Sequence, residues 1–337
     1  MREASHAAGP LDADPDARHS DGAERALLLA AAGAPLEVPL RRIVDWALEA
    51  LEPLVPHHGA GWGIGTHDPP STHAMHLRRV PPALMLAYEG GGLALDYLRF
   101  VAAGLPGVTI NDADLRGHHP EIAAALEDVI CRPFGIRHAL VTSLPDPDVA
   151  GLHHLLMLWR GCADEPFTEI ERRRMERIAP HLLAAWRVAR RLHLASAGRR
   201  PAEGRALVDR RGRLHAFDLA IVRQLRAIDP DWTGPSLPSP LFPLAAGASS
   251  SLCCSGTRFA AEAVGELVEL SARSDPLLLL PPAERAVAER WAAGASARAI
   301  AAELGRSVAT VRNQVASAYA RLGVSSRLAL ARRLKAA

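Results

Sequence analysis

The C-terminal segment carries a closely spaced series of helix start and stop signals. Ser296 and Ser307 each precede an apolar helical pattern, where a side-chain hydroxyl can accept a hydrogen bond from a free backbone N–H of the first turn. Gly294, Gly305 and Gly323 follow such patterns, and glycine is favoured just past the end of a helix. The signals predict four short helices, at about 283–293, 296–304, 307–322 and 326–334.

The turn between the second and third predicted helices is as short as a helix-turn-helix requires. On the third helix Val311, Val315 and Leu322 recur on one face, which predicts that this face is buried. Arg312 and Asn313 point elsewhere. Arginine can pair with guanine and asparagine with adenine in the major groove, so an exposed edge of this kind is typical of a DNA-reading helix.

The charge distribution agrees with this interpretation. The whole chain of 337 residues has a formal net charge of +2. From Pro281 onward there are ten basic and three acidic residues, a charge of +7, which leaves −5 for the rest of the chain. A basic module on a mildly acidic body is typical of a nucleic-acid binder.

Four stretches resemble the LuxR/NarL/FixJ-type DNA-binding domain: LPPAERAV (280–287), IAAELG (300–305), ATVRNQV (309–315) and YARLGVSSR (319–327). The resemblance implies a four-helix domain at 277–337 whose last helix commonly dimerises. It further implies a phosphate contact from Thr310 and groove-facing positions at Arg312, Asn313 and Ala316 on the third helix. Arg321 lies farther along the same helix, where we expect it to contact phosphate, and Ser317 is a further candidate DNA contact. Ala286, Ala299, Gln314 and Ala320 depart from the usual pattern, which changes individual ion pairs and not the expected fold.

The front of the chain predicts a mixed α/β region. We expect a helix over 40–54, a strand or turn over 59–65, further helices over 93–103 and 121–130, and strands over 136–144 and 152–159. Thr168 and Glu171 form a capping-box pattern ahead of a long helix that continues to Leu194, with a kink expected at Pro180. Beyond it, the pattern predicts strand–turn–strand at 206–213, a helix at 217–228 and a last strand at 261–270.

This region lacks the acidic pocket of a receiver domain and the aromatic and aspartate arrangement of homoserine-lactone-binding domains. The stretch EPFTEIE (165–171), with the apolar strand pattern before it, is instead similar to GAF-like modules, which places such a module at residues 35–195. The stretch ALVDRRG (206–212) weakly resembles a PAS-like module, at residues 196–272. The stretch 1–34 is expected to be disordered or weakly helical. The predicted fold class is therefore a multi-domain chain, with an α/β sensor region followed by an all-α helix-turn-helix domain.

Three residues in the front region are candidates for contacting a sensed ligand. His138, His153 and Trp159 alternate in phase with apolar neighbours and are candidate ligand-binding residues, although ordinary packing of the histidines is the simpler alternative. Gly61, Gly63 and Gly65 lack the third glycine of a dinucleotide fingerprint. The four cysteines show no metal-ligand spacing, and we expect reduced thiols, no metal and no cofactor.

No signal peptide or membrane-length apolar run is evident, so we expect a cytoplasmic protein that does not enter a membrane. The expected function is sequence-specific DNA-binding regulation of transcription, without enzymatic activity. Double-stranded DNA and a second copy of the chain are the expected partners, and RNA polymerase and a small-molecule effector are candidates. The alternatives are a protein-interaction adaptor and an enzyme fused to a DNA-binding tail.

Overall fold

The computed structural model describes residues 15–196 and 203–335. The chain divides into two compact units. The first comprises residues up to 146 together with 151–189, and the second comprises 147–150 together with residues from 190 onward. The bounds of the predicted sensor modules, and their GAF-like and PAS-like character, stay predictions.

The first unit is built on a five-stranded antiparallel sheet in the order β2-β1-β5-β4-β3. Its strands are β1 (Gly59–His67), β2 (Pro70–Arg78), β3 (Thr109–Asn111), β4 (His138–Pro145) and β5 (His153–Arg160). The two strands expected at 136–144 and 152–159 are confirmed as the hairpin β4–β5. The segment at 59–65 is the start of β1, a strand that is buried over most of its length.

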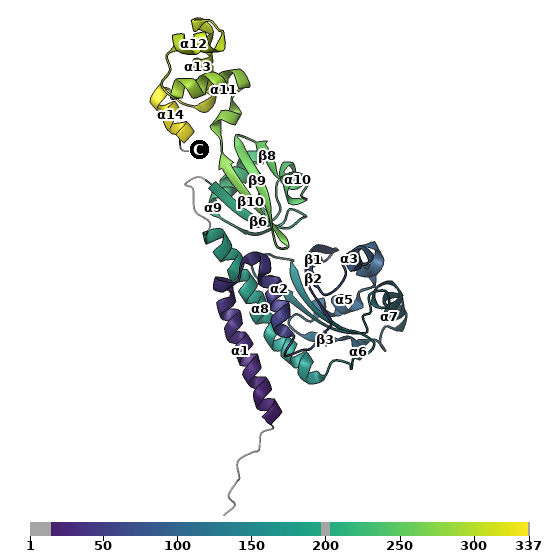
Figure 1. The fold of residues 1–337 in the computed structure, drawn as a ribbon. Helices are drawn as coiled ribbons and strands as arrows, with labels where there is room; N and C mark the ends of the chain where they lie inside the picture. The colour runs from purple at the N-terminus through teal and green to yellow at the C-terminus, as the bar shows by residue number, and fades with distance from the viewer. Residues whose placement is uncertain (1–14, 197–202, 336–337) are drawn as a thin grey trace, which may run out of the picture. The chain divides into compact units, whose positions relative to one another are not determined.

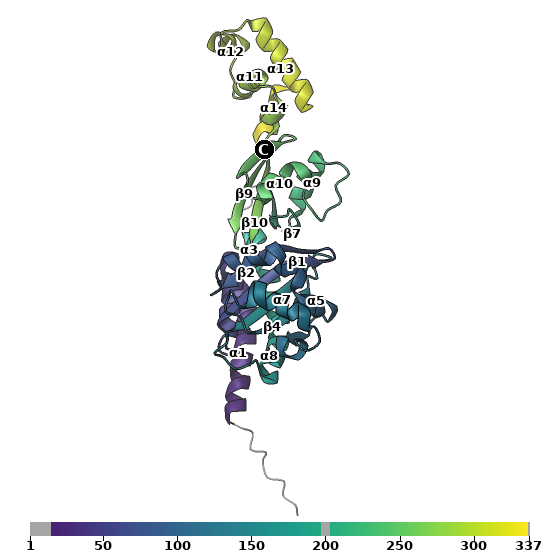
Figure 2. The ribbon, with the colours of Figure 1, turned by 90° about the vertical axis from the view of Figure 1, so that its right-hand side faces the viewer.

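Helices cover both faces of this sheet (Figure 1). One face carries α1 (Pro15–Glu37), α2 (Leu40–Leu51) and the beginning of α8 (Glu169–Ser196). The other carries α3 (Ala83–Ala87), α4 (Leu93–Leu95), α5 (Tyr97–Gly104), α6 (Asp112–Leu115) and α7 (Pro120–Leu126), with one π-helical segment after α3 and another after α7. The view turned by a right angle shows the same short helices in front of the sheet (Figure 2).

The long helices follow the predicted patterns. Ile43, Leu48 and Leu51 are buried on one side of α2, as the apolar spacing at 40–54 predicted. α8 begins directly after Thr168 and continues through Pro180. α1 is helical across most of the segment that was expected to be disordered or weakly helical, and it buries Leu27, Ala31 and Ala34; residues 1–14 lie outside the described part.

The helix expected at 93–103 is broken in two. Asp96 has φ −77° and ψ 78°, and its side chain accepts a hydrogen bond from the Arg99 N–H. An aspartate in that conformation caps the start of α5 and ends the preceding turn. The apolar pattern was correct, and the capping residue within it was missed.

The second unit contains another five-stranded antiparallel sheet, in the order β7-β6-β10-β9-β8. Counted along the chain this is second-first-fifth-fourth-third, the same order as in the first sheet. Its strands are β6 (Glu203–Val208), β7 (Leu214–Phe217), β8 (Ser251–Cys254), β9 (Thr257–Val264) and β10 (Leu267–Ser274). α9 (Leu219–Ile228) and α10 (Phe242–Ala245) pack against it through Ile221, Leu225 and Leu244.

One expectation for this sheet was wrong. The single strand predicted over 261–270 is two strands, because the chain turns between Val264 and Leu267 and pairs back on itself. Apolar and polar residues alternate on both sides of the turn, so the sequence pattern resembled that of a single strand.

The C-terminal part of the second unit consists of helices, as predicted. After a short 3-10 segment come α11 (Pro282–Ala292), α12 (Ala297–Leu304), α13 (Val308–Leu322) and α14 (Arg327–Lys335). Ser296 accepts from Ala299 N–H at 3.1 Å and Ser307 from Thr310 N–H at 3.0 Å, so both predicted caps are confirmed. Gly305 and Gly323 end α12 and α13 in the left-handed conformation, with φ of 61° and 63°.

None of the helices in the described ranges combines the length and the apolar character needed to cross a membrane.

Candidate functional sites

The third helix of the C-terminal module, α13, has one buried and one exposed side. Val311, Val315, Ala318 and Leu322 are buried, and they pack into the two apolar clusters that hold this module together. The side facing away from them is exposed. This arrangement fixes which side chains α13 can present to another molecule.

Five of the six predicted DNA-contacting residues are exposed: Thr310, Arg312, Asn313, Ala316 and Arg321. Within the described ranges, no side-chain hydrogen bond or ion pair engages Arg312 or Asn313. The Thr310 hydroxyl lies 2.8 Å from the Ser307 hydroxyl at the start of the helix. Arg312 and Asn313 are therefore available to donate hydrogen bonds to a partner.

Two of the six predicted contacts, Ser317 and the exposed Arg321, are engaged within the protein. The Ser317 hydroxyl donates to Glu284 Oε1 at 2.9 Å, and Arg321 Nε lies 3.2 Å from Glu284 Oε2. Glu284 belongs to α11, and its contacts with these two residues of α13 were not predicted from the sequence. The only sequence signal was its place in the family-like stretch at 280–287.

Two further contacts hold α13 against the rest of the module. Arg306 donates to Gln314 Oε1 at 2.6 Å and to the Ala283 carbonyl at 3.1 Å, so the unusual glutamine at 314 has its own partner. Trp291 Nε1 donates to the Tyr319 hydroxyl at 2.8 Å. These bonds fix the angle at which α13 is presented.

A second candidate site is an apolar cavity in the first unit. It lies between the sheet and the short helices α3–α7 and has a volume of about 70 Å³. That volume exceeds what one water needs. Its apolar lining includes Leu84, Leu126, Ile130, Val141, Met157 and Trp159.

Three of the four glycines of β1, Gly61, Gly63 and Gly65, lie on the cavity side of the sheet. A Cβ atom at Gly61 would come within 2.7 Å of the Trp159 ring, and one at Gly63 within 2.9 Å of the Met75 methyl group. At Gly65 the obstacle is the Ser71 carbonyl oxygen, at 2.2 Å. Gly61 and Gly63 therefore make room for side chains that line the cavity, and Gly65 makes room for the backbone of the neighbouring strand.

Two tyrosine–aspartate pairs form the polar wall of the cavity. Tyr88 donates to Asp96 at 2.6 Å, and Tyr97 donates to Asp112 at 2.5 Å. Burial raises the pKa of both tyrosines, and the neighbouring aspartates raise it further. Burial also raises the pKa of Asp96. Aromatic and aspartate side chains thus converge here, an arrangement that the sequence alone had not revealed.

The tyrosine hydroxyl groups and the guanidinium of this wall already donate to partners within the protein. Arg116 Nε donates to Asp112 at 2.5 Å, and its two terminal nitrogens bond to Glu127 and to the carbonyl of Arg137. Both tyrosine hydroxyl groups donate to carboxylates, and burial raises the pKa of the Cys131 thiol to about 12. The wall consequently offers mainly acceptor oxygens to an occupant.

The three candidate ligand residues are separated by the fold. Trp159 lines the cavity, whereas His138 and His153 are not among its lining residues. His138 precedes Ala139, which faces the cavity, so the alternation of β4 turns His138 away from it. His153 is the first residue of β5, and the centroid of its ring lies 4.1 Å from the ring centroid of His67. Burial lowers the pKa of both histidines.

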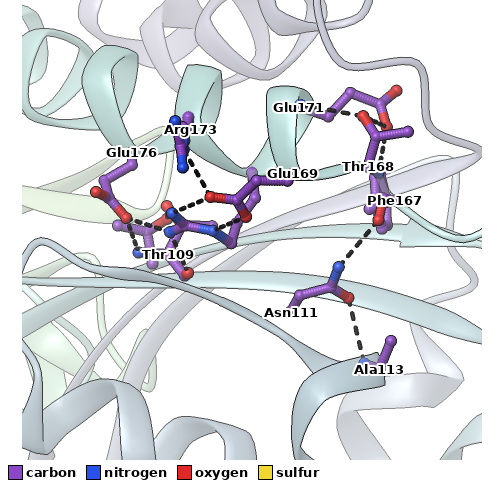
Figure 3. Close-up of polar contacts among 11 residues, drawn as sticks. Thr109, Asn111, Ala113, Phe167, Thr168, Glu169, Glu171, Arg173 and Glu176 are labelled. Atoms are coloured by element: carbon purple, nitrogen blue, oxygen red, sulfur yellow. Dashed lines mark hydrogen bonds and ion pairs between the residues drawn. The ribbon is translucent and has the colours of Figure 1, made fainter.

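Figure 3 shows how the start of α8 holds the edge strand β3. Thr109 N–H donates to Glu176 at 2.9 Å, and Arg172 donates to the Thr109 carbonyl at 3.0 Å and to Glu176 at 2.5 Å. The Thr168–Glu171 capping box is confirmed, with Thr168 N–H donating at 2.8 Å. Arg172 therefore binds a backbone carbonyl and a carboxylate at the edge of the sheet.

A buried histidine network lies on the face of the first unit's sheet that is turned away from the cavity. Trp62 Nε1 donates to His154 Nδ1 at 3.0 Å, and His154 Nε2 lies 2.9 Å from Asp146. Because Nδ1 accepts, the proton of a neutral imidazole must be on Nε2, where it can bind Asp146. Among the described residues, no group of three or more His, Cys, Asp or Glu is placed to hold a metal ion.

Comparison with known proteins assigns the C-terminal module. Residues 279–334 match the family described as bacterial regulatory proteins, luxR family (GerE). No curated protein sequence matches the chain.

Two solved structures are similar at low identity. SdiA of Escherichia coli is 13% identical, with a TM-score of 0.38 over 94% of this chain and 97% of that one. CepR2 of Burkholderia cenocepacia, described as an N-acylhomoserine lactone dependent LuxR family factor, is 16% identical, with a TM-score of 0.36 over 49% of this chain and 93% of that one.

Proposed function

We propose that this chain, whose residues 279–334 form a DNA-binding domain of the luxR family of bacterial regulatory proteins, regulates transcription in response to a small molecule. It binds double-stranded DNA through α13, as a homodimer. The small molecule occupies the cavity of the first unit.

The availability of Arg312 and Asn313 is the observation that carries the DNA-binding part. Both are exposed on α13 opposite its buried side, and their donors have no side-chain partner in the described ranges. Arginine and asparagine are the side chains that pair bidentately with guanine and adenine. Thr310 and Ala316 complete the exposed surface that would enter the groove.

Selection from a randomised duplex pool tests this part. The full chain should enrich a short, two-fold symmetric site, because a homodimer presents two copies of α13. Sedimentation of the complex should give two chains per duplex. Failure to enrich any sequence, or binding as a single chain, would contradict the proposal. Transcription with bacterial RNA polymerase from the enriched site then shows whether binding raises or lowers initiation.

The ligand-binding part is supported by the cavity lining. A mostly apolar space with a few convergent polar groups is typical of a small-molecule site. Its wall presents acceptor oxygens from Tyr88, Tyr97 and Asp112, so the best occupant is a small apolar molecule that donates a hydrogen bond. Indole and phenol are suitable probes.

Thermal unfolding of the full chain tests the cavity. Indole or phenol should raise the melting temperature of the wild type and should fail to do so in Ala139→Leu, which fills the cavity. Ala260→Leu makes the same change at an exposed position of β9 and should preserve the response. An equal response in all three proteins would show that the probes bind elsewhere.

A further inference from the structure

The carboxylate of Glu284 lies directly beneath the exposed side of α13. Its side chain is 14% exposed, and it accepts a hydrogen bond from Ser317 at 2.9 Å. The second oxygen lies 3.2 Å from Arg321 Nε without the geometry of a directed hydrogen bond. The contact with Arg321 is therefore an ion pair that can be exchanged.

Arg321 belongs to the same line of side chains as predicted DNA contacts. Thr310, Asn313, Ser317 and Arg321 follow one another at spacings of three and four residues, which places them along one side of an α-helix. The Arg321 side chain is 52% exposed. It thus lies where α13 would meet DNA, although its charge is compensated by a carboxylate of the same domain.

This compensation matters because affinity for DNA depends on the number of phosphates that a protein neutralises. Each neutralised phosphate releases bound counterions, and the salt dependence of binding rises accordingly. Arg298 and Arg312 have no ion-pair partner within the described ranges, so their full charge is available. Arg321 with Glu284 has a net charge of zero.

We infer that Glu284 is an internal counter-ion for Arg321, which lowers the sequence-independent affinity of α13 for DNA. Arg321 adds to phosphate binding only after exchanging the carboxylate of Glu284 for a phosphate. Glu284 is thus a positioning residue for the DNA-binding surface. The hydrogen bond from Ser317 keeps its carboxylate at this place when Arg321 leaves.

Glu284→Gln removes the charge while keeping the side-chain length and an acceptor for Ser317. The full-length variant and the wild type are titrated with a random-sequence duplex at several salt concentrations. At about 0.1 M salt the variant should bind roughly five- to tenfold more tightly, with a log–log salt slope steeper by about one. An unchanged or shallower slope overturns the inference.

Two further variants separate masking of Arg321 from a general effect of charge. Glu303→Gln removes a carboxylate that pairs with Arg290 at 2.8 Å in the same domain, and it should leave the slope unchanged. Adding Arg321→Ala to Glu284→Gln should restore the wild-type slope. A steeper slope in Glu303→Gln, or one that persists in the double variant, overturns the inference. Thermal melting verifies each fold, and the uncharged Glu284→Met replaces the glutamine variant if that one melts early.

Discussion

At Gly61 a single methyl group would decide the shape of the cavity. Its Cβ would lie 2.7 Å from the far edge of the Trp159 ring and 3.1 Å from the Met157 methyl group. Trp159 is almost fully buried, so its ring cannot move outward, and the nearest open space is the cavity.

Gly61→Ala should therefore destabilise the first unit and block the cavity. Overpacking of this kind costs about 1–3 kcal/mol, and the displaced Trp159 ring should abolish the response to indole. Gly117→Ala is the matched control, because a Cβ there meets nothing within 4 Å. Denaturant unfolding and thermal shift of both variants test this; equal stability of the two would show that Trp159 relaxes without cost.

Arg312 is where sequence preference should be determined. Arg312→Ala should cost about 1–3 kcal/mol at the selected site and relax the preference at one or two base pairs. Arg312→Lys keeps the charge and loses the planar pair of donors, so it should lose preference while retaining affinity for random DNA. Titration on both duplexes distinguishes these effects. Wild-type preference in both variants would rule out Arg312 as a base-reading residue.

His67 should make stability depend on pH. Burial, together with His153 and Arg99, lowers its pKa to about 4, below the ordinary value near 6.5. The unfolded chain therefore binds a proton at His67 more readily than the folded chain does. The free energy of unfolding is unaffected by this group above about pH 6.5, and it decreases as the pH falls from 6.5 toward 4. His67→Leu should show a smaller decrease of melting temperature over this interval than wild type. The exposed His118→Leu should behave as wild type, and equal slopes in all three would exclude His67.

At the scale of elements, α8 closes the outer edge of β3. An edge strand presents unpaired N–H and C=O groups, and here Glu176 and Arg172 bind both groups of Thr109. The capping box at Thr168 fixes the helix start from which these two side chains extend.

Glu176→Ala should free the Thr109 amide and destabilise the first unit by about 1 kcal/mol, the value of a typical lost hydrogen bond. Hydrogen exchange at Thr109 should become faster. Arg173→Ala removes a neighbouring arginine that is 65% exposed and that, among the described residues, pairs with Glu169 alone, so it should change stability by at most ~0.5 kcal/mol. Unchanged exchange at Thr109 in Glu176→Ala would show that the edge is protected otherwise.

Elements with local signals were predicted well from the sequence. The caps at Ser296, Ser307 and Thr168 act within one turn, so the residues that form them are adjacent in the chain. The cavity depends on tertiary contacts. Trp159 could be proposed from the alternation of β5, but Tyr88 and Asp96 belong to short helices interrupted by a π-helical segment, where no regular period identifies a buried face.

At the scale of the whole molecule, the helical module contains its own core. Two buried clusters lie entirely between Leu277 and Leu334, and they join all four helices. Residues 277–337 expressed alone should give a helical circular dichroism spectrum with a cooperative melt. Val311→Asp buries an unpaired charge in this core and should abolish the melt. A coil spectrum of the unmodified fragment would show that the module needs the rest of the chain.

The strand order of the two sheets also has a kinetic consequence. In each sheet the first strand pairs with the last, as Gly59 pairs with Trp159 and Val208 with Val268. Closing a long loop costs conformational entropy, and the strand pairing offsets this cost only after the loop has closed. Contacts between residues distant in the chain therefore form slowly. The helices α11–α14 are joined by short turns and need only nearby partners. A refolding chain should thus recover its DNA-binding module first, while each sheet stays open until its last strand arrives.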